Sequence, residues 1–227
     1  MEAIILAGGL GTRLKSVVSD LPKPMAPIEE KPFLEYILHY LLKNKITRVI
    51  LSVGYQWQSI KSYFGNNFRE IELIYSIENE PLGTGGAIKK ALEKINNQQC
   101  FILNGDTFFN VDLQTLTLPS NSKIILSLKK MHHFDRYGCV ENNTQQKVSS
   151  FTEKVYRTEG NINGGVYLVN KNIFNDFDLE SKFSFEAFMQ ENFKKLGISV
   201  KIFEDYFIDI GIPDDYAKAQ NEIKLQL

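Results

Sequence analysis

The chain has 227 residues, of which 43% are hydrophobic and 23% charged, a composition typical of a globular protein that can bury a sizeable core. Its 26 basic and 27 acidic residues give a formal net charge of −1, so we expect no nucleic-acid partner and no basic membrane-binding surface. The two cysteines, Cys100 and Cys139, lack the spacing of a zinc site or a disulfide framework, and no apolar run approaches the roughly 20 residues that span a bilayer. We therefore expect a cytoplasmic protein with reduced thiols.

The first half of the chain alternates strand and helix patterns. Short apolar runs predict strands at residues 3–6, 48–53, 72–76 and 100–103, and amphipathic patterns predict helices at residues 33–42, 57–64 and 86–95. This alternation is typical of βαβ units, so we predict an α/β protein with a Rossmann-like, mostly parallel sheet flanked by helices. Ligands of such sheets bind beyond the carboxyl ends of the strands, where a glycine-rich segment and Asp106 both fall.

The second half has more strands and fewer helices. We predict strands at residues 123–129, 138–141, 148–152 and 165–169, then a helix at 185–196, a strand at 200–204 and a last helix at 214–224. These strands indicate a smaller antiparallel β lobe against the first sheet. We expect one domain over residues 1–227, made of a first half at about 1–120 and a lobe at about 121–227 with a cleft between them.

The glycine-rich segment from Ile5 to Met25 reads ILAGGLGTRLKSVVSDLPKPM. A dinucleotide-binding G-x-G-x-x-G that starts at Gly9 would need glycine where Leu14 stands, and the spacing of a Walker A loop is absent as well. The segment is therefore neither of these two nucleotide-binding loops.

The same segment still suits an anion. Gly8, Gly9 and Gly11 have no side chain to keep a phosphate from the backbone, while Arg13 and Lys23 supply cations. From the glycines alone, a tight turn with two surface cations explains the segment equally well.

The wider pattern resembles the sugar-1-phosphate nucleotidylyltransferases, whose signature is L-A-G-G-x-G-T-R-L followed by P-K-P-M. Further matching segments are ENEPLGTGGA at 78–87, NGD at 104–106, FTEK at 151–154, NGGVY at 163–167 and DIGIP at 209–213. The resemblance covers nearly the whole chain and departs from the usual D-I-G-T-P at Ile212. It implies a nucleotide-diphospho-sugar transferase fold, with a nucleotide-binding first half and a sugar-binding lobe.

The resemblance also implies a reaction. In this family, an oxygen of a sugar 1-phosphate attacks the α-phosphorus of a nucleoside triphosphate and pyrophosphate leaves, so positioning and charge neutralisation carry the rate. Asp106 and Asp209 would hold one Mg²⁺, a cation that prefers oxygen ligands. Arg13 would face the departing pyrophosphate, Lys23 would lie near the reacting centre, and Lys154 would hold the sugar phosphate.

The residues expected at the two substrates follow from the matching motifs. The nucleotide-binding set is Leu6, Gly8, Gly9, Gly11, Thr12, Arg13, Glu80, Gly83 and Asp106. The sugar-phosphate-binding set is Tyr137, Gly138, Glu153, Lys154, Asn163 and Asp209. Because a carboxylate accepts both donors on the guanine edge, Glu80 predicts GTP, although a solvent-facing glutamate at a helix start fits the same position.

The identity of the sugar is less constrained. Chain length and overall motif wording favour a heptose 1-phosphate, activated for surface polysaccharide, over mannose 1-phosphate or another hexose 1-phosphate used with UTP or dTTP. A nucleotide-binding regulatory subunit without catalysis is a further alternative, against which the retained charged residues argue. The sequence leaves open whether the protein forms a homo-oligomer.

Overall fold

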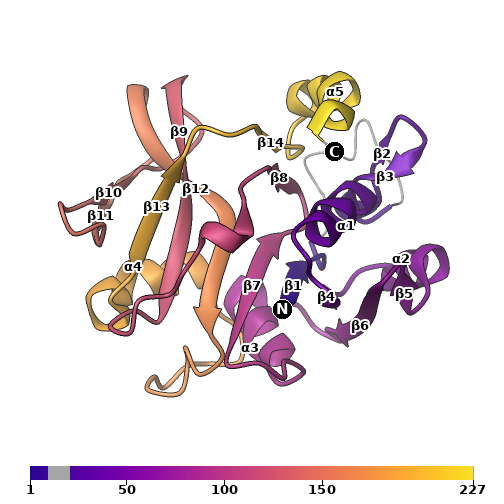
Figure 1. Ribbon diagram of the computed structural model, residues 1–227, viewed down its shortest axis with the longest axis horizontal. Coiled ribbons are helices and arrows are strands. Elements are labelled where there is room, and N and C mark those ends of the chain that lie inside the picture. The colour runs from indigo at the N-terminus through magenta and orange to yellow at the C-terminus, as the bar shows by residue number, and fades with distance from the viewer. Residues whose placement is uncertain (10–20, 227) are drawn as a thin grey trace.

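The computed structural model describes residues 1–9 and 21–226, and its elements follow one another in nearly the predicted order (Figure 1). The helices are α1 (Phe33–Lys43), α2 (Trp57–Phe64), α3 (Gly83–Leu92), α4 (Phe185–Leu196) and α5 (Pro213–Glu222). The strands of the first half are β1 (Glu2–Leu6), β2 (Pro27–Ile28), β3 (Lys31–Pro32), β4 (Arg48–Val53), β5 (Asn67–Phe68), β6 (Ile71–Ile77), β7 (Gln99–Asn104) and β8 (Thr107–Phe109). Those of the second half are β9 (Ile124–Phe134), β10 (Val140–Asn142), β11 (Val148–Phe151), β12 (Arg157–Asn170), β13 (Ser199–Phe203) and β14 (Phe207–Asp209).

One eight-stranded sheet, in the order β13-β9-β12-β7-β1-β4-β6-β5, runs through both halves. In the first half β1 pairs in parallel with β4 and β7, and β4 pairs in parallel with β6. Strand β12 joins the halves because it is antiparallel to both β7 and β9. The predicted fold class is therefore confirmed, and the antiparallel strands of the second half extend the main sheet, with the β10–β11 pair as a separate small sheet beside it (Figure 1).

Strands β9 and β12 are longer than the apolar pattern predicted. β9 continues to Phe134 and β12 already begins at Arg157, and these added ends pair with each other. Their residues are mostly exposed or half-buried, so the added ends lack the run of apolar residues from which a buried strand is predicted.

The sheet is covered on both faces, as expected for parallel strands. Alternate residues of β1 point to opposite faces: Ala3 and Ile5 belong to one core cluster and Ile4 to the other. The first cluster takes side chains from α1, α2 and α5, and the second takes side chains from α3 and α4. In Figure 1, α1 and α2 lie beside the strands of the first half and α4 beside those of the second.

The carboxyl ends of the parallel strands are held together by backbone hydrogen bonds. The amide of Ala7 donates to the carbonyl of Ser52 at 2.7 Å, and the amide of Gly105 donates to the carbonyl of Leu6 at 3.0 Å. The amide of Glu78 donates to the carbonyl of Val53 at 2.7 Å. These bonds bring the segments that follow β1, β4, β6 and β7 to one edge of the sheet.

Both cysteines are buried free thiols. Burial, reinforced by the nearby Glu2 carboxylate, raises the pKa of Cys100 to about 12, so its thiol stays protonated and acts as a packing group. No helix in residues 1–9 and 21–226 has the length and apolar character needed to cross a bilayer.

A buried carboxylate fixes the start of the sheet. Glu2 is 4% exposed, and its Oε2 accepts from the amides of Asn96 at 2.9 Å and Asn97 at 2.7 Å. Its Oε1 pairs with Arg48. Burial alone would raise the pKa of Glu2, but the hydrogen bonds from Asn97, Arg48 and Asn96 outweigh it and lower the pKa. Glu2 therefore stabilises the fold above the unfolded-state pKa of a glutamate, and this contribution is lost as the pH falls through its lower folded-state pKa.

Replacing Glu2 tests this interaction. Glu2→Ala should lower the free energy of unfolding at neutral pH by about 3 kcal/mol, because it leaves two backbone amides without their acceptor and removes the buried carboxylate partner of Arg48. Glu72→Ala is the matched control: it removes the other partner of Arg48, at 3.1 Å but with a side chain 57% exposed. The control should cost less than about 1 kcal/mol. Equal losses in urea denaturation would contradict the assignment.

Candidate active site

A lysine and an aspartate from distant parts of the chain form an ion pair at the carboxyl edge of the sheet. Lys23 begins a short 3-10 turn (Lys23–Met25) after Pro22, and Asp106 follows β7. Lys23 Nζ lies 2.5 Å from Asp106 Oδ2, and the two side chains are 12% and 35% exposed. Two residues predicted at the reacting centre are therefore in direct contact, with most of the lysine side chain buried.

A glycine makes this contact possible. A Cβ on Gly105 would lie 2.4 Å from the carbonyl oxygen of Leu6 and 3.2 Å from Cγ of Pro24. Only a residue without a side chain lets the turn before Asp106 approach β1 and the Lys23 turn this closely. Leu6, predicted to bind nucleotide, contributes a backbone carbonyl to this junction.

Asp209 reaches the same place from the C-terminal part of the chain. Strand β14 is antiparallel to β8, so Asp209 lies opposite Thr107, and the amide of Ile210 donates to the carbonyl of Asp106 at 3.0 Å. The two predicted carboxylates are thus neighbours, although about half of the chain separates them in sequence.

The surroundings of Asp209 work against its charge. Burial and, after it, the Asp106 carboxylate raise the pKa of Asp209, while Lys23, the amide of Gly211 and Arg136 act in the opposite direction. Oδ1 of Asp209 accepts from the Gly211 amide at 2.7 Å. A second negative group held this close to Asp106 is costly unless cations share the site.

The donor set fits a magnesium ion. Asp106 and Asp209 meet beside Lys23. Carboxylate oxygens are the ligands that Mg²⁺ prefers. In residues 1–9 and 21–226 no group of three or more His, Cys, Asp or Glu could hold a metal by itself. Such a partial site suits Mg²⁺, which usually takes one or two carboxylates and completes its shell with water and substrate phosphates.

The other end of this edge holds a glutamate that the sequence analysis did not single out. Oε2 of Glu78 accepts from the Leu82 amide at 3.1 Å, and Oε1 accepts from the Ser52 hydroxyl at 3.3 Å. A Cβ on Gly8 would lie 2.9 Å from Oε1 of Glu78, so the backbone at Gly8 passes directly over this carboxylate. Its position immediately after β6 was the sequence signal that could have identified it.

The remaining predicted nucleotide residues are less constrained. Gly9 and Glu80 are exposed, and a Cβ on Gly9 would meet nothing within 4 Å. Gly83 has a φ of +68°, and a Cβ there would lie 2.5 Å from the carbonyl oxygen of Phe183, so packing already requires a glycine. Nucleotide contacts of these three residues stay predictions. Gly11, Thr12 and Arg13 lie outside the described residues.

A cavity of about 440 Å³ lies in the second half. Its lining includes five of the six residues predicted at the sugar phosphate: Tyr137, Gly138, Glu153, Lys154 and Asn163. They come from the segments that join β9 to β10 and β11 to β12, and from β12 itself. The volume falls in the range of small-molecule sites. Sequence reasoning missed the facing wall, which α4 supplies.

Close backbone packing and one buried tyrosine shape the cavity. A Cβ on Gly138 would lie 2.4 Å from the carbonyl oxygen of Thr152, so this glycine lets the two joining segments touch. The side-chain Nδ2 of Asn163 donates to the hydroxyl of buried Tyr167 at 2.8 Å, and its Oδ1 accepts from the backbone amide of Gly165 at 3.1 Å. Asn163 is thereby fixed in orientation before any ligand binds.

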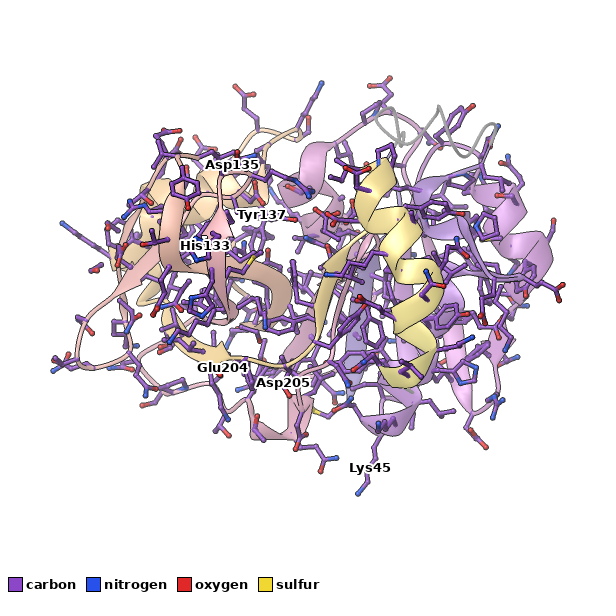
Figure 2. All side chains as sticks on the ribbon, turned by 90° about the horizontal axis from the view of Figure 1, so that it is seen from above. Lys45, His133, Asp135, Tyr137, Glu204 and Asp205 are labelled. Carbon is purple, nitrogen blue, oxygen red and sulfur yellow. The ribbon has the colours of Figure 1, made fainter. Side chains whose placement is uncertain are left out.

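Tyr137 connects the cavity to the carboxylates. Its hydroxyl donates to Oδ2 of Asp209 at 3.3 Å, and burial followed by the charge of Asp209 raises the pKa of Tyr137. In Figure 2 Tyr137 lies nearer the middle of the molecule than His133 or Asp135, toward the elements of the first half. Arg136, the preceding residue, forms a 2.5 Å ion pair with Asp215 and lies 5.3 Å from the Tyr137 ring. Tyr137 therefore joins the lining of the cavity to Asp209, which lies beside Asp106 and Lys23.

The chain is similar to known proteins over nearly its whole length. A relative from Campylobacter jejuni named D-glycero-alpha-D-manno-heptose 1-phosphate guanylyltransferase is 59% identical over 95% of this chain and 97% of its own. One of the same name from Aneurinibacillus thermoaerophilus is 54% identical over 99% of both chains. The crystal structure of HddC from Yersinia pseudotuberculosis complexed with GMP-PN has a TM-score of 0.83 and 38% identity, over 97% of this chain and 98% of that one. The family model described as Nucleotidyl transferase matches residues 2–226, and the chain belongs to this family.

Proposed function

We propose that the protein joins GTP and D-glycero-α-D-manno-heptose 1-phosphate to give GDP-heptose and pyrophosphate. The observation that carries this proposal is the continuity of the site. Tyr137 lines the cavity together with the other sugar-motif residues and donates a hydrogen bond to Asp209. Asp209 lies beside the Asp106–Lys23 pair at the carboxyl edge of the sheet. The names of two relatives at more than half identity over nearly the whole chain support the choice of substrates.

The reaction needs little from the protein beyond placement and charge. An oxygen of the sugar phosphate forms a bond to the α-phosphorus of GTP, and the bond from that phosphorus to the β-bridging oxygen breaks as pyrophosphate leaves. Both reactants are anions, so a cation must offset their repulsion. Lys23, held by Asp106 and mostly buried, offers that charge at a fixed point. Lys154 lines the cavity and would hold the sugar phosphate, and Arg13 remains the predicted contact of the leaving pyrophosphate.

Asp106 and Asp209 would hold a Mg²⁺ ion when nucleotide is bound. The ion would supply further neutralisation of the phosphates as charge shifts onto the leaving group. Hydrogen bonds orient both carboxylates for this role. Asp209 accepts from the Gly211 amide and the Tyr137 hydroxyl, and Asp106 accepts from Lys23 and the Thr107 hydroxyl.

For the guanine base we propose Glu78 as the acceptor, with Glu80 as the alternative that the sequence predicts. Guanine presents a ring N–H and an exocyclic amine side by side, and one carboxylate can accept from both. Glu78 is half-buried, lies under Gly8 and is oriented by the Leu82 amide, whereas Glu80 is exposed. A carboxylate that is already fixed loses less freedom when the base binds.

A substrate panel tests the reaction. Pyrophosphate release should be fastest with GTP and the heptose phosphate, and slower with UTP, with dTTP or with mannose 1-phosphate. Asp106→Asn should lower kcat at least about 100-fold, because it removes a charge at the reacting phosphates. The control is Asp112→Asn, an exposed cap that accepts from the Gln114 amide at 2.9 Å; it should keep full turnover. Faster turnover with UTP or dTTP, or full activity of Asp106→Asn, would contradict the proposal. If no nucleotide in the panel gives pyrophosphate release, the protein is better explained as a regulatory subunit.

The base acceptor is tested by a matched pair of isosteric variants. Glu78→Gln should lower kcat/KM for GTP about tenfold or more, because an amide cannot accept from both guanine donors. Glu80→Gln should change it by less than about threefold, the scale of an exposed interaction. The reverse pattern in initial-rate measurements would assign the base to Glu80 instead.

A further inference from the structure

Helix α4 presents one face to the cavity. The lining residues of this helix are Glu186, Met189, Gln190 and Phe193. Their spacing of three and four residues puts them on one side of an α-helix. Met189 is fully buried, and the Phe193 ring lies 6.1 Å from that of Phe151 on β11. The apolar pair anchors the helix and leaves Glu186 and Gln190 as the polar groups of this wall.

These two polar side chains are available to a ligand. Both are exposed, and neither has a hydrogen-bond partner among the other residues that the structure describes. The start of the helix is fixed nearby: the Ser184 hydroxyl accepts from the Ala187 amide at 3.3 Å, and the Thr84 hydroxyl accepts from the Phe185 amide at 2.8 Å. The wall is therefore held in place by bonds that Glu186 and Gln190 do not make.

The helix runs away from the reacting centre. Phe185, at its near end, packs edge-on against Tyr167 of β12 with the ring centroids 5.4 Å apart. On the same strand, a Cβ on Gly165 would lie 2.6 Å from the side-chain nitrogen of Asn104, which stands two residues before Asp106. Gln190 lies one turn beyond Glu186, about 6 Å by the rise of an α-helix. Phe193 follows against β11 at the far end. A sugar in the cavity, with its phosphate held by Lys154 on the side where Tyr137 meets Asp209, therefore has Gln190 in the wall beside it.

The chemistry of the sugar then gives this wall a task. A manno-heptose differs from mannose by one more hydroxyl-bearing carbon on the exocyclic arm at C5, which lies on the opposite face of the ring from the α-phosphate at C1. A hydroxyl group is read by hydrogen bonds, which a site with unpartnered polar groups can supply. Gln190 can donate and accept, and Glu186 can accept.

We infer that Gln190, together with Glu186 one turn before it, determines the specificity for heptose by binding the hydroxyls of its exocyclic arm. This inference rests on the proposed function and goes beyond it, because it assigns the choice between a seven-carbon and a six-carbon sugar to one helix face. Gln190 contacts only the substrate arm and takes no part in the transfer itself.

The ratio of kcat/KM for the heptose phosphate to that for mannose 1-phosphate, both with GTP, tests the inference. Gln190→Ala should lower kcat/KM for the heptose phosphate about tenfold or more and change that for mannose 1-phosphate less than about threefold. Glu191→Ala, on the neighbouring exposed position outside the cavity, is the matched control and should leave both values unchanged. Glu186→Gln keeps the side-chain shape and should shift the ratio in the same direction.

The outcomes separate the two proposals. Equal losses for both sugars, or an unchanged ratio in Gln190→Ala and Glu186→Gln, would overturn the specificity role while leaving the heptose reaction standing. If the wild-type protein uses GTP with mannose 1-phosphate but not with the heptose phosphate, the proposed function itself fails. Thermal unfolding of each variant checks that the fold is intact, and calorimetric binding of the two sugar phosphates replaces kinetics for any variant that turns over too slowly.

Discussion

The active site depends on one close approach between two backbone segments. Gly105 lies against the carbonyl of Leu6, where a side chain would stand 2.4 Å from that oxygen. This contact places the turn after β7 beside β1. The same turn contains Asp106, which therefore pairs with the nearly buried Lys23. The β8–β14 pairing then adds Asp209 from the far end of the chain. These backbone contacts bring together the side chains of Lys23, Asp106 and Asp209 from three separate segments.

The charges at this junction are unbalanced in a way that suits phosphate chemistry. Among the described residues Lys23 pairs with Asp106, and burial together with Asp106 raises the pKa of Asp209 although Lys23 and Arg136 act in the opposite direction. An ion pair that served stability alone would need no second carboxylate. We propose that the arrangement is half of a site, which a Mg²⁺ ion bound with the nucleotide would complete. In the proposed reaction, the second anion would approach from the cavity beside Tyr137.

The sequence predicted the features that depend on local patterns. The buried strands at 48–53 and 100–103 lie within β4 and β7, because short apolar runs between polar turns identify them directly. Five of the six residues predicted at the sugar phosphate line the cavity, four of them on joining segments and Asn163 on β12. Of the long-range contacts, the family resemblance predicted that Asp106 and Asp209 meet, and local patterns predicted none of the others. Helix α3 begins at Gly83, earlier than predicted, where packing against Phe183 holds glycines that are poor helix formers. The wall formed by α4 and the contact of Glu78 with Gly8 likewise arise only after folding.

A crystal structure with Mn²⁺ and a non-hydrolysable GTP analogue tests the central claim most directly, because manganese replaces magnesium and is located by its anomalous signal. We expect one anomalous peak bound by both Asp106 and Asp209 and by the nucleotide phosphates, with Lys23 directed at the α-phosphate. A peak coordinated by the phosphates alone, with the Lys23–Asp106 pair unchanged and Asp209 unligated, would contradict the view that these carboxylates form one metal-assisted transfer site.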